Sequence, residues 1–216
     1  MDGPHSGAGR HLCFQDGCMI SAASTTIAII GAGPLGRSLA LRAAQAGFRV
    51  VLEDVMPSNL RHAQEALRAS LGESLVASGR GVQGNGEGRL AVSFASTVEE
   101  AVRQAEIAID CVPDELESKL EIFCLLDRMA PPRTILLTPT TTQSIADLAS
   151  CTYRPERCLA IALSAQQLAE ESSGSVVPLR RTRLTHPVAE ALVVEFWNRL
   201  GCRVDMETDS FGIAQS

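Results

Sequence analysis

The stretch "IAIIGAGPLGRS", residues 27–38, is an apolar run followed by three glycines in the spacing Gly-x-Gly-x-x-Gly. Where such a stretch forms a strand, a turn and a helix, each glycine has a physical role. Gly31 makes the tight turn, Gly33 lets a pyrophosphate approach the backbone, and Gly36 lets the helix pack close to the strand. The sequence therefore predicts a dinucleotide site at this turn.

The start of the predicted helix would hold the phosphates, because its free N–H groups and the positive end of its dipole favour an anion there. Pro34 has no N–H, but its fixed φ suits the first helical position, and Leu35 and Gly36 keep their donors. We expect Gly31, Gly33, Pro34, Leu35 and Gly36 to line the pyrophosphate.

A carboxylate ends the next apolar run, "FRVVLED", residues 48–54. Asp54 stands about 20 residues beyond the glycines, where an acid accepts hydrogen bonds from the adenine ribose. A carboxylate there repels a 2′-phosphate, so the order of strand, glycines, helix, strand and acid favours NAD as the cofactor. Alternatively, Asp54 is an ordinary strand-end residue, and Arg61 nearby leaves NADP open.

Short β-rich runs alternate with helical patterns after residue 25, which predicts βαβ units and a mostly parallel sheet. We therefore expect an α/β fold, a doubly wound Rossmann-type domain over residues 26–216, with the cofactor crevice at the carboxyl ends of the strands. The expected strands are residues 26–31, 48–53, 89–94, 106–112, 134–139, 157–163 and 202–207.

The expected helices carry apolar residues at helical spacing, which predicts one buried stripe on each. Over residues 57–77 the stripe is Leu60, Ala63, Leu67, Leu71 and Leu75, and over 114–129 it is Leu116, Leu120, Phe123, Leu126 and Met129. A further helix is expected to have Thr185 as its N-cap, Pro187 in its first turn and Gly201 as its stop. His186 is then a solvated helix-start residue and not a catalyst.

Composition limits the other function classes. The net charge of −6 and the lack of a Lys/Arg block argue against nucleic acid as a partner. No apolar run approaches the roughly 20 residues of a membrane span, and the N-terminus lacks the order of a secretory signal. Seven scattered cysteines fit a reducing compartment. We therefore expect a cytoplasmic protein.

Two segments are expected to be irregular. Residues 1–25 are small and polar with no hydrophobic period, so we expect a disordered leader, and residues 79–88 are rich in glycine, as in a flexible connection. His11, Cys13 and Cys18 in the leader lack a second ligand pair at the spacing of a zinc site. We therefore expect no metal.

Four segments together resemble the NAD-binding domain of the 3-hydroxyacyl-CoA dehydrogenase family: residues 27–54, 105–149, 154–163 and 201–212. The most specific match is "DCVPDELESK", which resembles the family's acid-Ala-Val-Pro-Glu pattern and the lysine that follows it. The resemblance implies that Asp114 and Lys119 lie near the nicotinamide end of the cofactor, and that Val112 and Thr140 contact it. Alternatively, Asp114 and Lys119 are surface charges, with Asp114 favouring the helix dipole.

The same resemblance locates the family's catalytic pair, a histidine base steadied by a glutamate. "AIALSAQ", residues 160–166, puts Ala162 at the histidine, and the glutamate falls on Pro178, or on Gly174 if the intervening loop is not lengthened. Neither alanine nor proline can take a proton, so the family's mechanism cannot run as written. Glu170 and Glu171 are weak substitutes, because an exposed carboxylate has too low a pKa for this task near neutrality.

Other positions of the family's active site also differ. The family's Asn-Thr-Ser-Ser motif becomes "PTTT", residues 139–142, which keeps a hydroxyl at Thr141 and loses the amide at Pro139. The resemblance runs into "METDSFG" without the family's C-terminal helical domain, which completes the acyl-binding cleft. We expect that loss to leave an apolar surface that favours a homodimer.

Two classes of function stay open at this point. One is an NAD-binding member of fatty-acid and acyl-CoA metabolism that is impaired in catalysis on its own, which includes a purely regulatory NAD-binding module. The other is an active NAD-dependent 3-hydroxyacyl-CoA dehydrogenase completed by a partner, acting on an acyl-CoA or a small 3-hydroxy acid. Fold does not separate them, because function depends on the site.

Overall fold

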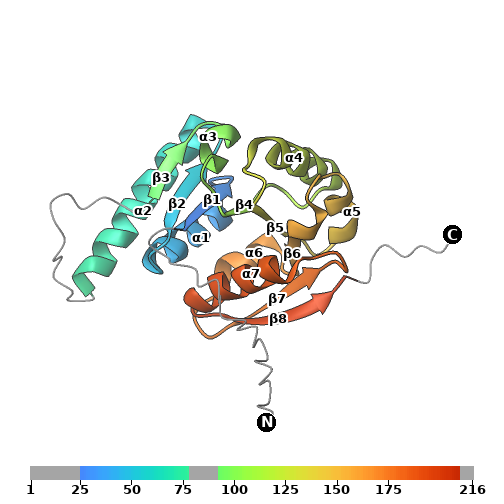
Figure 1. Cartoon of the computed structure of the whole chain (residues 1–216). Helices are drawn as coiled ribbons and strands as arrows, with labels where there is room; N and C mark the ends of the chain where they lie inside the picture. The colour runs from blue at the N-terminus through green and yellow to red at the C-terminus, as the bar shows by residue number, and fades with distance from the viewer. Residues whose placement is uncertain (1–24, 78–91, 210–216) are drawn as a thin grey trace, which may run out of the picture.

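One eight-stranded sheet runs through the computed structural model, which describes residues 25–77 and 92–209 (Figure 1). The strand order is β3-β2-β1-β4-β5-β6-β7-β8. The strands are β1 (Thr26–Ile30), β2 (Arg49–Glu53), β3 (Val92–Ala95), β4 (Ile107–Asp110), β5 (Ile135–Pro139), β6 (Cys158–Ile161), β7 (Val176–Arg181) and β8 (Arg203–Thr208). The expected leader, apart from Thr25, its cluster of His11, Cys13 and Cys18, and the glycine-rich residues 79–88 lie outside the described residues.

The pairing confirms the predicted mostly parallel sheet, because every neighbouring pair is parallel except β6 and β7. β7 itself was not among the expected strands. Pro178 lies in the middle of β7 and has no N–H to donate to a neighbouring strand. A proline at such a position in a sequence argues against predicting a central strand. In the sheet, the Pro178 carbonyl accepts from the Ala162 N–H at 2.8 Å, so the carbonyl still contributes to the pairing with the preceding strand.

Helices cover both faces of the sheet (Figure 1). Side chains of β1 alternate, with Ile27 and Ile29 on one face and Ala28 and Ile30 on the other. The first face packs against α1 (Pro34–Gln45), α2 (Pro57–Ala77), α6 (Ala165–Glu170) and α7 (Pro187–Arg199), and the second against α3 (Val98–Val102), α4 (Leu116–Met129) and α5 (Ile145–Ser150). The result is a three-layer α/β sandwich.

The helix starts and stripes are partly as predicted. On α2, Ala63 and Leu67 are buried, and the side chain of Leu75 lies outside those described. The N-cap of α7 is His186, whose Nδ1 accepts from the Val188 N–H at 3.2 Å, so the expectation of Thr185 was wrong. Thr185 is instead used inside the preceding turn, where its hydroxyl accepts from the Thr182 N–H.

The stripe predicted for α4 was also wrong at its two ends. Leu116 and Met129 are exposed, while Lys119, Ile122 and Asp127 are buried with the expected Phe123 and Leu126. Polar side chains occupy the buried face because partners on other elements satisfy them, which the spacing of apolar residues cannot indicate.

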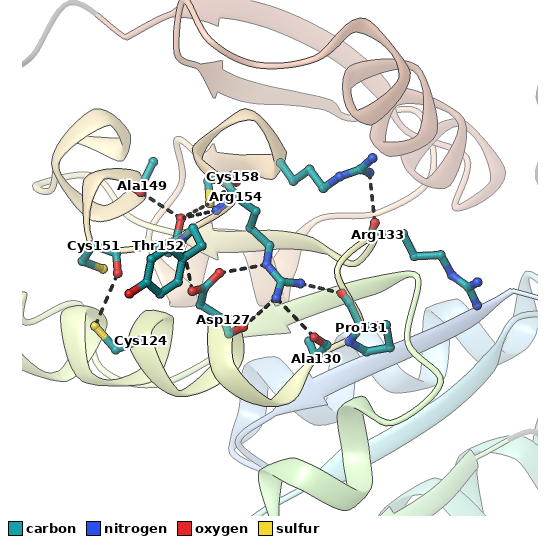
Figure 2. Close-up of polar contacts among 12 residues, drawn as sticks. Cys124, Asp127, Ala130, Pro131, Arg133, Ala149, Cys151, Thr152, Arg154 and Cys158 are labelled. Carbon is teal, nitrogen blue, oxygen red and sulfur yellow. Dashed lines mark hydrogen bonds and ion pairs between the residues drawn. The ribbon is translucent and has the colours of Figure 1, made fainter.

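Arg154 provides one of these partners, just before the short 3-10 helix η1 (Pro155–Arg157) (Figure 2). Its guanidinium donates to Asp127 Oδ1 at 2.8 Å and to the carbonyls of Asp127, Ala130 and Pro131 at 2.6, 3.2 and 2.5 Å. The last carbonyls of a helix have no intrahelical partner. One side chain therefore closes the C-terminal end of α4 and joins it to the chain that leads into β6.

The strand order sets the position of the site. The order reverses between β1 and β4, where the carboxyl ends of β1, β2 and β4 lie side by side. In open α/β sheets, ligands bind at this reversal. No helix in the described part of the chain is long and apolar enough to cross a membrane.

Candidate functional site

The glycine turn after β1 has the geometry that its spacing predicts. Gly31 adopts a backbone φ of 106°, an angle that residues with a side chain rarely adopt. Its N–H donates to the Glu53 carbonyl at 2.8 Å. A Cβ on Gly36 would lie 1.8 Å from the Gly31 carbonyl oxygen, so only glycine permits this packing of α1 on β1. A Cβ on Gly33 would meet nothing within 4 Å, so the backbone there faces open space.

The N-terminus of α1 begins in that open space. Gly33 is its N-cap and makes no side-chain cap, and Pro34 is the first helical residue. The first N–H groups of a helix have no intrahelical partner, so Leu35 and Gly36 present donors at the turn, as predicted from the sequence. The turn itself is braced by Arg37, which donates to the Ala32 carbonyl at 2.9 Å.

Asp54 is nearly buried and joins the end of β2 to the glycine turn. Its Oδ2 accepts from the Ala32 N–H at 2.9 Å, and its Oδ1 accepts from the Met56 N–H at 2.8 Å. Asn59 at the start of α2 donates to both oxygens, at 3.2 and 3.1 Å. Asn59 could not be singled out from the sequence, because asparagine is common near helix starts for the sake of capping alone.

A pocket of about 410 Å³ opens beside these residues. Its walls are mainly apolar, and Glu53, Asp54 and Asn59 supply the polar side chains. The lining residues are Ile30, Gly31, Gly33, Glu53, Asp54, Val55, Asn59, Val98, Cys111, Val112, Pro113 and Ile122. Three residues predicted from separate segments, Gly33, Asp54 and Val112, thus come together around one pocket.

A buried ion pair holds the end of β4. Lys119 and Asp110 are both 0% exposed, and the Lys119 Nζ lies 3.0 Å from Asp110 Oδ2 and 3.1 Å from the Val112 carbonyl. Thr138 and the Val112 N–H donate to the same carboxylate at 2.9 and 2.8 Å. Burial raises the pKa of Asp110, and the Lys119 ammonium and these hydrogen bonds oppose that rise.

The loops after β4 and β5 are joined by Asp114. Its Oδ2 accepts from the Thr141 N–H at 3.1 Å and from the Thr142 hydroxyl at 3.3 Å, while its Oδ1 is buried with no hydrogen-bond partner in the described structure. Thr140 is fully buried, and its hydroxyl accepts from the Gln143 N–H at 2.9 Å. The sequence-predicted Asp114 and Thr140 therefore belong to one loop pair.

The residues aligned with a catalytic pair lie next to each other across β6 and β7. Ala162 follows the last residue of β6, and its N–H donates to the carbonyl of Pro178 in β7 at 2.8 Å. In the described part of the chain the histidines are His62, exposed on α2, and His186, the N-cap of α7. Glu170 is exposed at the end of α6 and accepts from Gln166 at 3.2 Å.

A glycine turn and an acid at the reversal of a doubly wound sheet define a Rossmann-type dinucleotide-binding protein. The family described as 3-hydroxyacyl-CoA dehydrogenase, NAD binding domain, matches residues 26–163, more than half of the chain. The chain belongs to this family, whose cofactor is NAD.

Individual relatives agree with the family. The chain is 33% identical over 136 residues to a probable 3-hydroxybutyryl-CoA dehydrogenase of Bacillus subtilis, covering 62% of this chain and 46% of that protein. It is 38% identical over 118 residues to a lambda-crystallin homolog of Bos taurus, covering 54% of this chain and 36% of that protein. The chain thus matches less than half the length of these relatives.

Solved structures have the same fold. The (S)-3-hydroxybutyryl-CoA dehydrogenase of Ralstonia eutropha superposes with a TM-score of 0.73 at 20% identity, over 88% of this chain and 65% of that one. At this identity the likeness concerns the fold, and the similarity extends beyond residue 163 to most of the described sheet.

Proposed function

We propose that NAD lies across the carboxyl ends of β1, β2 and β4, with its pyrophosphate at the turn of Gly31, Gly33 and Gly36 and its adenine ribose at Asp54. The open space at Gly33 supports this placement, because a pyrophosphate needs close approach to the backbone there. The present contacts fill the roughly four lone-pair sites of the Asp54 carboxylate, so a ribose hydroxyl would take the place of one of the two long contacts from Asn59.

The nicotinamide half is proposed to extend toward the loops after β4 and β5. The buried Oδ1 of Asp114 supports this, because it has no hydrogen-bond partner in the described structure and a hydroxyl of the cofactor would supply one. Val112 and Thr140 stay predicted contacts. The ammonium of Lys119 is engaged by Asp110 and the Val112 carbonyl, which favours a role in positioning the β4 end.

The chain on its own is proposed to turn over 3-hydroxyacyl-CoA substrates slowly or not at all. The observation that carries this is the pair Ala162 and Pro178, which are neighbours in the sheet and hold no titratable group. Bound NAD supplies a hydride acceptor, and oxidising an alcohol also needs a base for the hydroxyl proton. A cytoplasmic role in acyl-CoA metabolism is part of this proposal, and the family supports its acyl-CoA part.

Steady-state formation of NADH from short and medium 3-hydroxyacyl-CoAs tests the proposal, with NAD titrated into the same samples to verify binding. We expect binding with little or no turnover, because a positioned general base contributes about 10²–10⁴-fold. Robust turnover would contradict the impairment, and replacing Glu170, Glu171 and His186 in turn would then identify the base. Turnover that appears only on adding a second protein would support a partner-completed enzyme.

A further inference from the structure

Glu53, the last residue of β2, is 5% exposed and lines the pocket beside Asp54. A buried carboxyl is ordinarily paired or hydrogen-bonded. Within residues 25–77 and 92–209, the Glu53 side chain makes no hydrogen bond or ion pair. Its carboxyl is therefore a polar group without a protein partner in the wall of a mainly apolar pocket, to which Asp54 and Asn59 also contribute.

The surroundings of Glu53 are apolar on each side. Ile30 of β1 and Ala95 of β3 are its neighbours in the sheet, and Val98 of α3 and Ile122 of α4 line the same pocket. A mainly apolar pocket with a few polar groups suits a nucleobase, in which polar atoms lie on the edge of an aromatic ring.

Charged groups near the pocket leave the carboxyl without a counter-ion. Asp54 is its charged neighbour, Glu99 and Glu100 of α3 are exposed, and Lys119 of α4 is already paired with Asp110. Burial, and then the charge of Asp54, raises the pKa of Glu53 to about 7. A proton is therefore held on this carboxyl through the acidic side of neutrality.

We propose that Glu53 recognises the adenine base of NAD, with its protonated carboxyl donating to a ring nitrogen and accepting from the N6 amino group. A carboxylic acid carries one O–H donor beside a carbonyl acceptor, and adenine presents an acceptor nitrogen beside the N6 donor. The inference rests on the proposed NAD site. It assigns recognition of the adenine base to Glu53, whereas the proposed function assigns the adenine ribose to Asp54.

Two substitutions separate this role from a structural one. Glu53→Gln keeps one donor and one acceptor at every pH, and Glu53→Leu removes both while keeping the pocket apolar. Glu99→Gln removes a charge from the exposed face of α3 and is the matched control. All four proteins carry His62→Asn, which removes the exposed imidazole of α2 from the pH comparison.

The measurement is calorimetric titration of each purified protein with NAD and with 1,N6-etheno-NAD, whose N6 edge is blocked, at pH 6 and pH 8. For the parent we expect NAD affinity to fall about tenfold between these pH values, as the protonated fraction falls. Glu53→Gln should hold the pH 6 affinity at both values, and Glu53→Leu should lose much of the preference for NAD over the etheno analogue. Glu99→Gln should behave like the parent.

The outcomes separate the two proposals. If no protein binds NAD, although all are folded by circular dichroism, then the proposed cofactor site fails. If NAD binds and Glu53→Leu keeps the parent's preference and pH profile, then the role of Glu53 in base recognition is overturned. A preference for NAD that persists in Glu53→Leu would also overturn this role, because the etheno group would then be excluded by shape alone.

Discussion

Gly33 and Gly36 lie three residues apart in one turn, yet a methyl group at each would meet different surroundings. At Gly36 it would lie 1.8 Å from a backbone oxygen, and at Gly33 it would enter open space. The φ of −67° at Gly33 is one that alanine adopts readily. The two positions therefore separate the needs of the fold from those of the cofactor.

We expect Gly33→Ala to fold normally and to weaken NAD binding by more than about tenfold, or about 1.4 kcal/mol, because the methyl group occupies the approach of the pyrophosphate. Gly36→Ala should lower the free energy of unfolding by about 3 kcal/mol or more through overpacking. Urea unfolding and NAD titration of both variants measure this. Equal NAD affinity in Gly33→Ala and the parent would mean that the cofactor does not contact this turn.

Glu53 also makes stability depend on pH. Its pKa is raised from 4.5 to about 7 on folding, so the folded state binds a proton that the unfolded chain releases. The stabilisation is complete below about pH 4.5 and is lost as pH rises through about 7. The free energy of unfolding of Glu53→Gln, compared with that of the parent, should therefore be more favourable at pH 8 than at pH 5. Urea unfolding at both pH values tests this, and an unchanged difference would contradict it.

At the scale of elements, Arg154 connects α4 to the chain before β6 through contacts that are nearly all buried (Figure 2). Removing one partner of a buried pair leaves the other charge uncompensated, which costs about 3–5 kcal/mol. We expect Arg154→Met to lose about that much unfolding free energy, while NAD affinity of the folded protein stays unchanged. Arg154 does not line the pocket, so the substitution should lower the unfolding free energy without changing the NAD affinity.

Arg157 offers a matched control for this prediction. It lies in η1 and donates to the Arg133 carbonyl at 3.0 Å in an exposed contact. Exposed polar contacts contribute about 0–1 kcal/mol, so Arg157→Met should change stability little. A loss for Arg154→Met no larger than for Arg157→Met in urea unfolding would show that the buried network does not stabilise the end of α4.

For the whole molecule, cofactor binding should raise the melting temperature. A ligand that binds only the folded state at 100 times its Kd stabilises by about 2.7 kcal/mol, which corresponds to roughly 5–10 °C in a chain of this size. NADPH at equal concentration should raise it less, because Asp54 repels the 2′-phosphate, and Asp54→Asn should narrow the difference. Differential scanning fluorimetry measures both, and a larger shift with NADPH would contradict the assignment of Asp54.

The sheet shows where sequence patterns predict elements well. The central parallel strands were predicted because apolar, β-branched runs followed by helical spacing are local signals. β7 was missed because Pro178 argues against a central strand. The position of β7 in the sheet depends on its pairing with β6 and β8, which lie elsewhere in the sequence. The ends of α4 were mispredicted for a related reason, since Lys119 and Asp127 are buried by partners on other segments.

The sequence alone determined the glycine turn, the acid of the second strand and the alternation of strands and helices, because each depends on residues close along the chain. The tertiary structure decided which side chains share the site. Asn59 and Ala32 meet on Asp54, Lys119 closes on Asp110, and Ala162 lies beside Pro178 only because the strands pair in one register. The strand register decides which side chains lie side by side, and it is set by the free energy of the whole sheet. No short stretch of sequence contains that information.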